Sequence, residues 1–223
     1  MKQSPPRHPN GGCLGRREFL LTQLRTTAAI ALAGAGIHWP RLLSAAQSPD
    51  LVVATGDPAS AVNKAIAELG GMARFVEPGH RVVIKPNMSF PHPPERATNT
   101  HPEVVRAVVA ACKDAGAADV QVLDHPLRST EQCIEGVKQA CAVFDEDLVH
   151  GLKDSRHFKA TAIPEGRIFR NTDVLTGVLK ADVLIAVPVA KSHSSTGVSL
   201  SMKGMMGLIY DRGIMHYRYD LDE

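Results

Sequence analysis

The stretch Val183-Leu184-Ile185-Ala186-Val187 is a continuous apolar run, bounded by Asp182 and Pro188. This pattern is typical of a strand covered on both faces of a sheet, because neither side of such a strand meets water. Three similar runs precede it in the chain, at residues 51–54, 81–84 and 120–123. Because segments of helical length separate these runs, the sequence predicts an α/β domain with a mostly parallel sheet flanked by helices.

The segments between the runs carry helix start and stop signals. Asp57-Pro58 predicts an N-cap and a first-turn proline for a helix that ends at Gly70-Gly71. Thr100 and Glu103 predict a capping box at the start of a second helix. Further helices are expected at 130–144, 172–180 and 199–209, strand pieces and turns at 148–170, and an irregular proline-rich loop at 85–99.

The N-terminal region has the pattern of a twin-arginine export signal. Gly15-Arg16-Arg17-Glu18-Phe19-Leu20-Leu21 is followed by a mildly apolar stretch at 26–37 and by the small residues Ser44-Ala45-Ala46. This order predicts a signal peptide at 1–46, cleaved after Ala46, and an α/β domain at 47–223. The apolar stretch is shorter than the roughly 20 residues that span a bilayer, so no permanent membrane anchor is expected. We expect the twin-arginine export machinery to deliver the protein to the periplasm.

The charge of the chain changes when the signal is set aside. Residues 1–46 hold six of the 25 basic residues and one of the 23 acidic residues, which leaves 19 basic and 22 acidic residues. A net charge of about −3 argues against nucleic-acid binding, which needs concentrated positive charge.

Cysteines are sparse in the predicted domain. Cys112, Cys133 and Cys141 include no Cys-x-x-Cys pair, and their number is too small for an iron–sulfur cluster or a structural zinc site. Two interpretations of these cysteines remain open. One is a disulfide between Cys133 and Cys141 in an oxidising compartment, and the other is three apolar cysteines buried in the core.

Polar residues follow three of the predicted strands, where ligands of parallel α/β sheets usually bind. The three segments are Lys85-Pro86-Asn87, Asp124-His125-Pro126 and Lys191-Ser192-His193, the last of which continues into Ser194-Ser195-Thr196-Gly197. If the strands are parallel neighbours, these groups converge at one edge of the sheet. Lys85, Lys191 and Lys203 would make that edge cationic, which predicts a site for an anion.

Each of these residues also has a simpler explanation. A lysine is usually a solvated surface residue, Asp124 suits a turn, and a Ser/Thr/Gly run suits a flexible loop. Three other histidines have no partner in the pattern and are expected to be structural: His101, His150 and His157.

The same segments resemble the domain of unknown function 362 family. The first matching block is Val82-Val83-Ile84-Lys85-Pro86-Asn87 followed by residues 97–105. The second comprises residues 181–193 and Ser201-Met202-Lys203-Gly204-Met205-Met206-Gly207. His216 stands where members of that family commonly have a histidine after the glycine.

The chain also departs from the family pattern. Gly204 follows Lys203, where relatives usually have an asparagine, and the ferredoxin-like cysteine clusters of some relatives are absent from this sequence. The family domain normally continues beyond Asp220-Leu221-Asp222-Glu223, so the resemblance implies a truncated C-terminal part.

Three functions are compatible with these residues. In the leading one, an exported enzyme or binding protein holds an anionic small molecule or cofactor. Its negative groups lie on Lys85, Lys191 and Lys203, Asn87 and Asp124 complete the site, and His193 or His216 transfers a proton. The second is a metal site built from His193, His216 and Asp124 with His125. The third is a redox accessory protein that acts with an iron–sulfur partner and has no cluster of its own.

Overall fold

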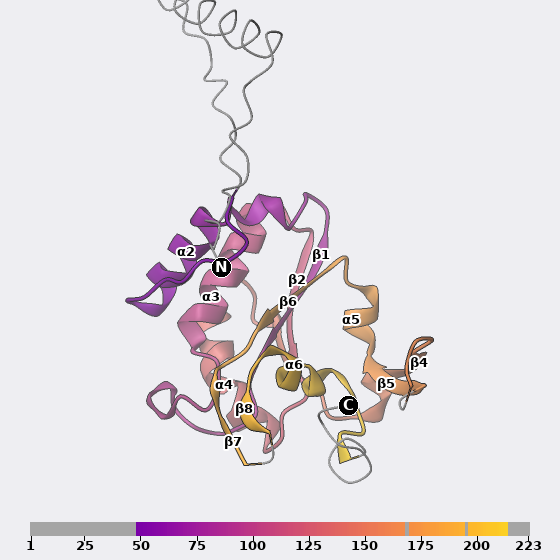
Figure 1. The fold of residues 1–223 in the computed structure, drawn as a ribbon. Coiled ribbons are helices and arrows are strands. Elements are labelled where there is room, and N and C mark those ends of the chain that lie inside the picture. The colour runs from indigo at the N-terminus through magenta and orange to yellow at the C-terminus, as the bar shows by residue number, and fades with distance from the viewer. Residues whose placement is uncertain (1–47, 168–169, 195, 214–223) are drawn as a thin grey trace, which may run out of the picture. The chain divides into compact units, whose positions relative to one another are not determined.

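The computed structural model describes residues 48–167, 170–194 and 196–213. The predicted signal peptide and His216 lie outside the described residues. The α/β class predicted from the sequence is confirmed, because the described chain forms a four-stranded parallel sheet with helices packed against it (Figure 1).

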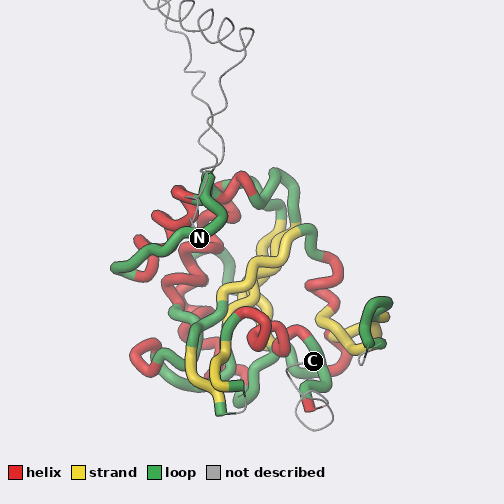
Figure 2. The backbone as a smooth tube through the Cα atoms, in the orientation of Figure 1, coloured by secondary structure: helices red, strands yellow, loops and turns green. Residues whose placement is uncertain are grey.

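Four strands form the central sheet: β1 (Arg81–Pro86), β2 (Asp119–Asp124), β3 (Val149–Gly151) and β6 (Val183–Val187). Their order is β3-β2-β1-β6, and every neighbouring pair is parallel. In the central register, Ile84 pairs with Val122 on one side and with Ile185 on the other. Because the strands are parallel, their carboxyl ends meet at one edge of the sheet, at the bottom of the view in Figure 2.

Three helices lie on one side of the sheet: α2 (Pro58–Glu68), α3 (Pro102–Asp114) and α4 (Thr130–Cys141) (Figure 1). Asp57 caps α2 as predicted, since its carboxylate accepts a hydrogen bond from the Ser60 amide at 3.0 Å. Val82 and Ile84 point toward this side and pack with residues of α3 such as Val105 and Val109. These contacts form the larger of the two clusters of buried apolar residues.

On the other side of the sheet lies α5 (Thr176–Lys180), preceded by an antiparallel pair, β4 (Phe158–Ala162) and β5 (Asn171–Leu175), that projects away from the domain as an arm (Figure 1). Alternate strand residues, among them Val83 and Leu123, point to this side and pack with Leu175 and Leu208. Burial on both faces explains why the middle residues of β1, Val82-Val83-Ile84, are all apolar.

The last described elements close over the carboxyl edge of the sheet. They are a short hairpin of β7 (Lys191–His193) and β8 (Gly197–Ser199), then α6 (Ser201–Gly204) and the 3-10 turn η4 (Met205–Leu208). Three more 3-10 turns occur elsewhere: η1 (Met72–Arg74), η2 (Pro94–Arg96) and η3 (Ser155–His157).

Four predictions about local structure are wrong. Residues 51–54 form no strand, and Leu51 and Val53 are 80% and 83% exposed, because no neighbouring strand pairs with them. The expected helix at 172–180 is reduced to α5, because residues 171–175 pair with β4 instead. The apolar run of β6 is not buried on both faces. It lies at the described edge of the sheet, where Leu184 is 38% exposed.

The fourth wrong prediction is the capping box at Thr100 and Glu103. The N-cap of α3 is His101, whose Nδ1 accepts a hydrogen bond from the Glu103 amide at 3.2 Å. Glu103 instead binds Arg106 one turn further along the helix. Thr100 therefore does not cap α3, and its hydroxyl forms hydrogen bonds with Asn87 and Val187 in the candidate site instead.

The cysteine alternatives are resolved in favour of buried thiols. Cys112, Cys133 and Cys141 are all free and buried. Cys133 and Cys141 lie two turns apart on α4, about 12 Å along the helix axis, which is too far for a disulfide. Burial raises the pKa of Cys112 and of Cys141 to about 11.

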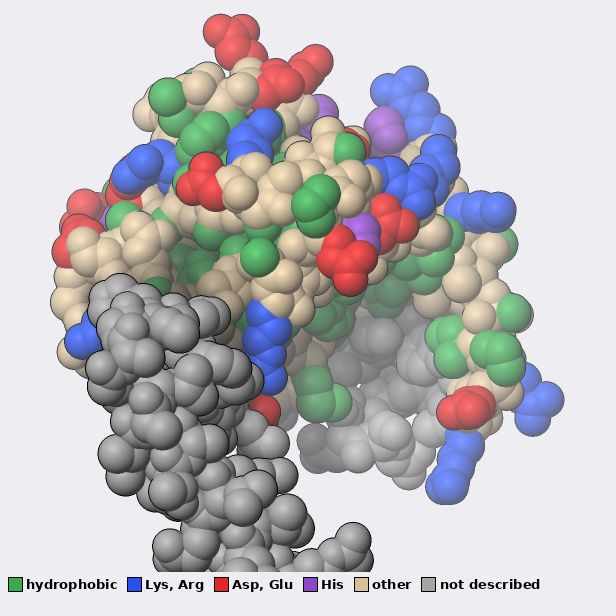
Figure 3. Space-filling model, turned by 90° about the horizontal axis from the view of Figure 1, so that it is seen from above, with side chains coloured by type: hydrophobic (Ala, Val, Ile, Leu, Met, Phe, Trp, Pro, Cys, Tyr) green, Lys and Arg blue, Asp and Glu red, His purple; other side chains and the backbone are tan. Residues whose placement is uncertain are grey.

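The surface at the opposite end of the domain, where the strands begin, carries acidic and basic side chains interspersed (Figure 3). Within the described ranges, no helix has both the length and the apolar character needed to cross a membrane.

Candidate functional site

A buried ion pair joins the ends of the two central strands. Lys85 at the end of β1 lies with its Nζ 2.8 Å from Oδ1 of Asp124 at the end of β2, and the two side chains are 3% and 2% exposed. The Asp124 carboxylate also accepts hydrogen bonds from the Met88 amide at 2.7 Å and the His125 amide at 2.8 Å. Buried charges are tolerated when they are paired and hydrogen-bonded in this way.

Gly207 packs directly against this ion pair. A Cβ atom built on Gly207 would lie 2.2 Å from Asp124 Oδ1 and 2.7 Å from Lys85 Cε. The Gly207 carbonyl also accepts a hydrogen bond from the His125 amide at 3.1 Å. The second sequence block therefore ends in glycine because only a residue without a side chain fits over the pair.

Thr100 connects the segment after β1 to the end of β6. Its hydroxyl donates to the Val187 carbonyl at 2.6 Å and accepts from the Asn87 amide at 2.9 Å. The Thr100 amide in turn donates to the Asn87 carbonyl at 2.9 Å. These bonds fix the backbone of Asn87 in place beside the end of β6.

Lys191 on β7 reaches across to the same segment. Its ammonium donates to the Thr98 carbonyl at 2.5 Å and to Oδ1 of Asn87 at 3.3 Å, and it lies 4.8 Å from the centre of the Phe90 ring. Burial lowers the pKa of Lys191, and the positive charge of Lys203 lowers it further, whereas Asp124 opposes the shift.

Lys203 and Arg212 add two further positive charges to the site. Lys203 Nζ lies 3.2 Å from the thioether sulfur of Met206, a weak acceptor that carries no charge. Burial lowers the pKa of Lys203, and the charge of Arg212 adds to the effect. The Arg212 guanidinium donates to the carbonyls of His125 at 2.9 Å and Pro126 at 3.4 Å.

His125 belongs to an aromatic cluster at the Arg212 end of the site. Its ring packs against Phe158 and stacks with Tyr210, with ring centres 5.3 Å and 6.2 Å away. Its Nδ1 lies 3.0 Å from the Ile209 carbonyl. Burial lowers the pKa of His125, which favours the neutral form of the ring.

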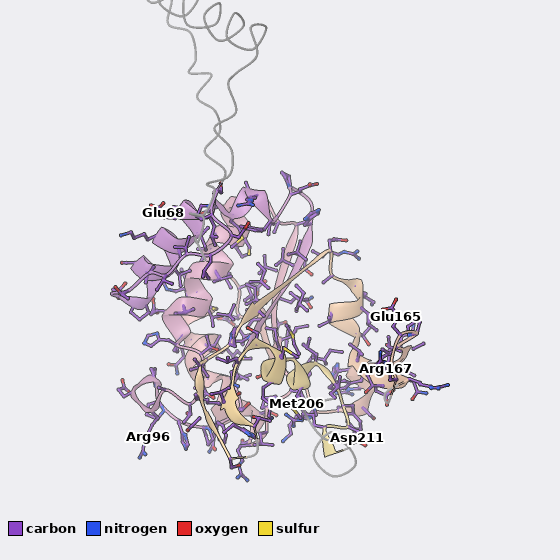
Figure 4. All side chains as sticks on the ribbon, in the orientation of Figure 1. Glu68, Arg96, Glu165, Arg167, Met206 and Asp211 are labelled. Atoms are coloured by element: carbon purple, nitrogen blue, oxygen red, sulfur yellow. The ribbon has the colours of Figure 1, made fainter. Side chains whose placement is uncertain are left out.

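These groups surround one cavity at the carboxyl edge of the sheet, with a volume of about 850 Å³. Its walls come from the segment after β1, from the β7–β8 hairpin and from the chain around η4. Figure 4 shows Arg96, Met206 and Asp211 at this end of the domain, whereas Glu165 and Arg167 lie out on the β4–β5 arm.

The residues predicted from the sequence are largely brought together. Six of them line the cavity: Lys85, Asn87, Asp124, Lys191, His193 and Lys203. His193 also sits within its hairpin, where its Nδ1 accepts a hydrogen bond from the Thr196 amide at 3.3 Å. His216, the other predicted proton-transfer residue, lies outside the described residues. Lys85 and Asp124 form an ion pair with each other, so they form the buried base of the cavity.

The alternative metal site gains no support from the described residues. Among residues 48–167, 170–194 and 196–213, no three His, Cys, Asp or Glu side chains are grouped closely enough to hold a metal ion. Both oxygens of Asp124 already accept hydrogen bonds.

Sequence reasoning missed several side chains that line the cavity, among them Arg96, Lys153, Tyr210 and Arg212. Arg96, Tyr210 and Arg212 stand on turns and loops away from the ends of the central strands, where no hydrophobic periodicity marks their position. Lys153 follows β3, a short strand whose end the sequence did not define. For Tyr210 and Arg212, the available signal was their position in the sequence, because both closely follow Gly207 of the second block.

The fold and site together define a class: an α/β protein with a cationic cavity at the carboxyl ends of its parallel strands. The chain belongs to the family described as Domain of unknown function (DUF362), whose model matches residues 82–222. It is 30% identical over 143 residues to the thylakoid-associated protein sll1697 of Synechocystis sp.. That match covers 63% of this chain and 43% of the relative, so the chain spans less than half of the curated relative's length.

Proposed function

We propose that this protein binds an anionic small molecule or cofactor in the cavity at the carboxyl ends of β1, β2 and β6. The observation that carries the proposal is the charge of the cavity wall. Among the described residues, six cationic side chains line it against two carboxylates: Lys85, Arg96, Lys153, Lys191, Lys203 and Arg212 against Asp124 and Asp211. Lys85 and Asp124 neutralise each other, which leaves four positive charges in excess.

The charge is concentrated rather than general. The chain beyond residue 46 has more acidic than basic residues, so a random part of its surface would be near neutral or negative. Lys191 and Lys203 are both half-buried, and this burial lowers the pKa of each ammonium group. An incoming anion would relieve that cost, because a nearby opposite charge favours the ionised form.

The proposal gives the residues separate roles. Lys191, Lys203 and Arg212 contact the negative groups, and Asn87 orients Lys191 through its side-chain oxygen. The Lys85–Asp124 pair holds the strand ends at the correct spacing. If the protein is an enzyme, His193 or His216 transfers the proton, since the unperturbed imidazole pKa is near neutrality.

We further propose export through the twin-arginine machinery, on the basis of the Arg16-Arg17 signal and the small residues before position 47. Replacing both arginines with lysine should retain the protein in the cytoplasm, whereas Arg25→Lys in the same region should leave export unchanged. Equal export of the two variants would contradict this proposal. Fractionation and the mass of the mature chain provide the measurement.

Calorimetric titration of the full chain with pyrophosphate and with citrate tests the binding proposal. We expect binding that weakens as salt rises, and a loss of about tenfold or more in Lys191→Gln and Lys203→Gln, since a charged hydrogen bond contributes roughly 1.5–3 kcal/mol. Lys113→Gln, an exposed lysine on α3, serves as the matched control. Absence of binding by the folded wild-type chain to either anion would reject the proposal and favour the redox accessory that acts with a partner.

A further inference from the structure

The cavity is much larger than the anion that its lysines would hold. Pockets of about 300–1,000 Å³ typically enclose organic ligands of drug size, and the volume of about 850 Å³ lies in the upper part of that range. A lone phosphate or a small carboxylate would fill only a fraction of it. The shape and chemistry of the remaining wall therefore bear on what the ligand is.

The positive charges of the inner wall come from three different segments rather than from a single point. Lys191 stands on β7, Lys203 on α6 and Arg212 shortly after η4, and all three line the same cavity. A ligand that engages all of them carries more than one anionic group, because a single charge would leave at least one of the three cations unmatched.

An aromatic surface adjoins Arg212, whose guanidinium donates to the carbonyl of His125. Tyr210 lines the cavity, is 40% exposed, and rests on His125, whose ring is nearly parallel to it at 14°. Phe158 packs against both rings and fixes their orientation. The amide of Tyr210 donates to the Asp173 carbonyl at 2.9 Å, so its backbone is also held.

Phe90, beside Lys191, has a different role. Its ring is stacked on His92, with centres 5.7 Å apart, and lies 4.8 Å from the Lys191 ammonium. It is therefore already engaged with two side chains. Tyr210 is the better candidate for a platform on which a flat ring of the ligand can stack.

We infer that the ligand combines a flat ring with two or more linked anionic groups, as a nucleoside diphosphate does. The ring lies on Tyr210, and the anionic groups extend over Arg212, Lys203 and Lys191. This inference rests on the proposed anion site and adds the class of molecule that it accepts. Tyr210 and the three cations line the same cavity, so one molecule with a ring and linked anionic groups can contact all of them.

Titration of the full chain with ADP, GDP, UDP, pyrophosphate and adenosine tests the anion site and the ring-binding surface separately. We expect at least one nucleoside diphosphate to bind about tenfold more tightly than pyrophosphate, because a stacked ring adds to the phosphate contacts. Adenosine should bind more weakly than either, since it carries no charge. If pyrophosphate binds and no nucleoside diphosphate binds more tightly, the result supports the anion site and contradicts the inference that a ring stacks on Tyr210.

Substitution of Tyr210 gives a second, independent readout. Tyr210→Ala should weaken the nucleoside diphosphate about tenfold and leave pyrophosphate unchanged, whereas Tyr210→Phe should retain both affinities because the ring remains. An equal loss for both probes in a folded Tyr210→Ala protein would contradict the inference. If no probe binds the wild-type chain, both the proposed function and this inference are wrong.

Discussion

Lys85 Nζ lies 2.8 Å from Asp124 Oδ1, where β1 and β2 end side by side, and both side chains are almost completely buried. The pair is the base of the candidate site, because the Met88 and His125 amides bind the same carboxylate and Gly207 covers it. The ion pair therefore helps to position the segments that follow β1 and β2.

Removing one member of this pair should destabilise the domain strongly. Lys85→Met leaves a buried carboxylate without its counter-charge, and we expect a loss of roughly 3–5 kcal/mol in the free energy of unfolding. Urea denaturation provides the measurement. The double variant Lys85→Met/Asp124→Leu should recover part of the loss, because no unpaired charge remains. A single variant as stable as wild type would show that the pair is dispensable.

Gly207 and Gly204 offer a matched comparison within one short segment. Gly207→Ala should cost roughly 1–3 kcal/mol, because its Cβ would meet Asp124 Oδ1 at 2.2 Å. Gly204→Ala should be neutral or slightly stabilising, since its Cβ would lie 3.8 Å from Pro188 and alanine favours a helix. Thermal unfolding of both variants decides the matter, and equal effects would argue against close packing at Gly207.

The sequence predicted the strands of the sheet better than it predicted their surroundings. β1, β2 and β6 were recognisable because each is an apolar run, and their parallel pairing brings Lys85, Asp124 and the β7 residues to one edge as expected. The run at 51–54 has a similar composition but finds no strand to pair with. Composition alone cannot distinguish these outcomes, because strand formation depends on non-local partners.

The site residues that the sequence did not predict are positioned by contacts with residues far away in the sequence. Thr100 has the sequence context of an N-cap, yet its hydroxyl binds the Val187 carbonyl 87 residues away. Arg212 reaches the site because its guanidinium binds two carbonyls that follow β2. Neither contact produces a local pattern, so neither residue was assigned to the site from the sequence.

Anion binding should be coupled to proton uptake at alkaline pH. The pKa values of Lys191 and Lys203 are below the usual lysine range, so both lose protons at a lower pH than an exposed lysine does. A bound anion favours the protonated forms and raises these pKa values. Titration with citrate, whose carboxylates are fully ionised at alkaline pH, in buffers of different ionisation enthalpy should show proton uptake that increases as the pH rises toward the ordinary lysine pKa. Binding at alkaline pH without such an increase would contradict the assignment.

The stability of the fold should decrease below about pH 6.5 because of His125. Burial lowers the pKa of His125 in the folded state, so the unfolded chain takes up a proton first as pH falls through the ordinary histidine pKa. Stability is lost from that pH down to the folded pKa, where the difference in bound protons disappears. In His125→Gln the unfolding free energy should vary less with pH in this window. An unchanged slope would show that His125 titrates normally.

The buried cysteines should be unreactive in the folded protein. With pKa values of about 11, Cys112 and Cys141 hold almost no thiolate at neutral pH, and both side chains are buried. A Cys13→Ser chain should give little reaction with a thiol reagent until denaturant is added, and then three thiols. Fewer than three after unfolding without reductant would reveal a disulfide.

The most direct test of the central claim compares two variants of equal net charge. Lys203→Gln/Arg212→Gln removes two charges from the cavity, and Lys113→Gln/Lys138→Gln removes two from exposed positions on α3 and α4. Calorimetric titration with pyrophosphate should show normal affinity in the exposed variant and a loss of about a hundredfold in the cavity variant, since two charged contacts disappear. Equal affinities in the two variants, both folded, would show that the anion does not bind in this cavity.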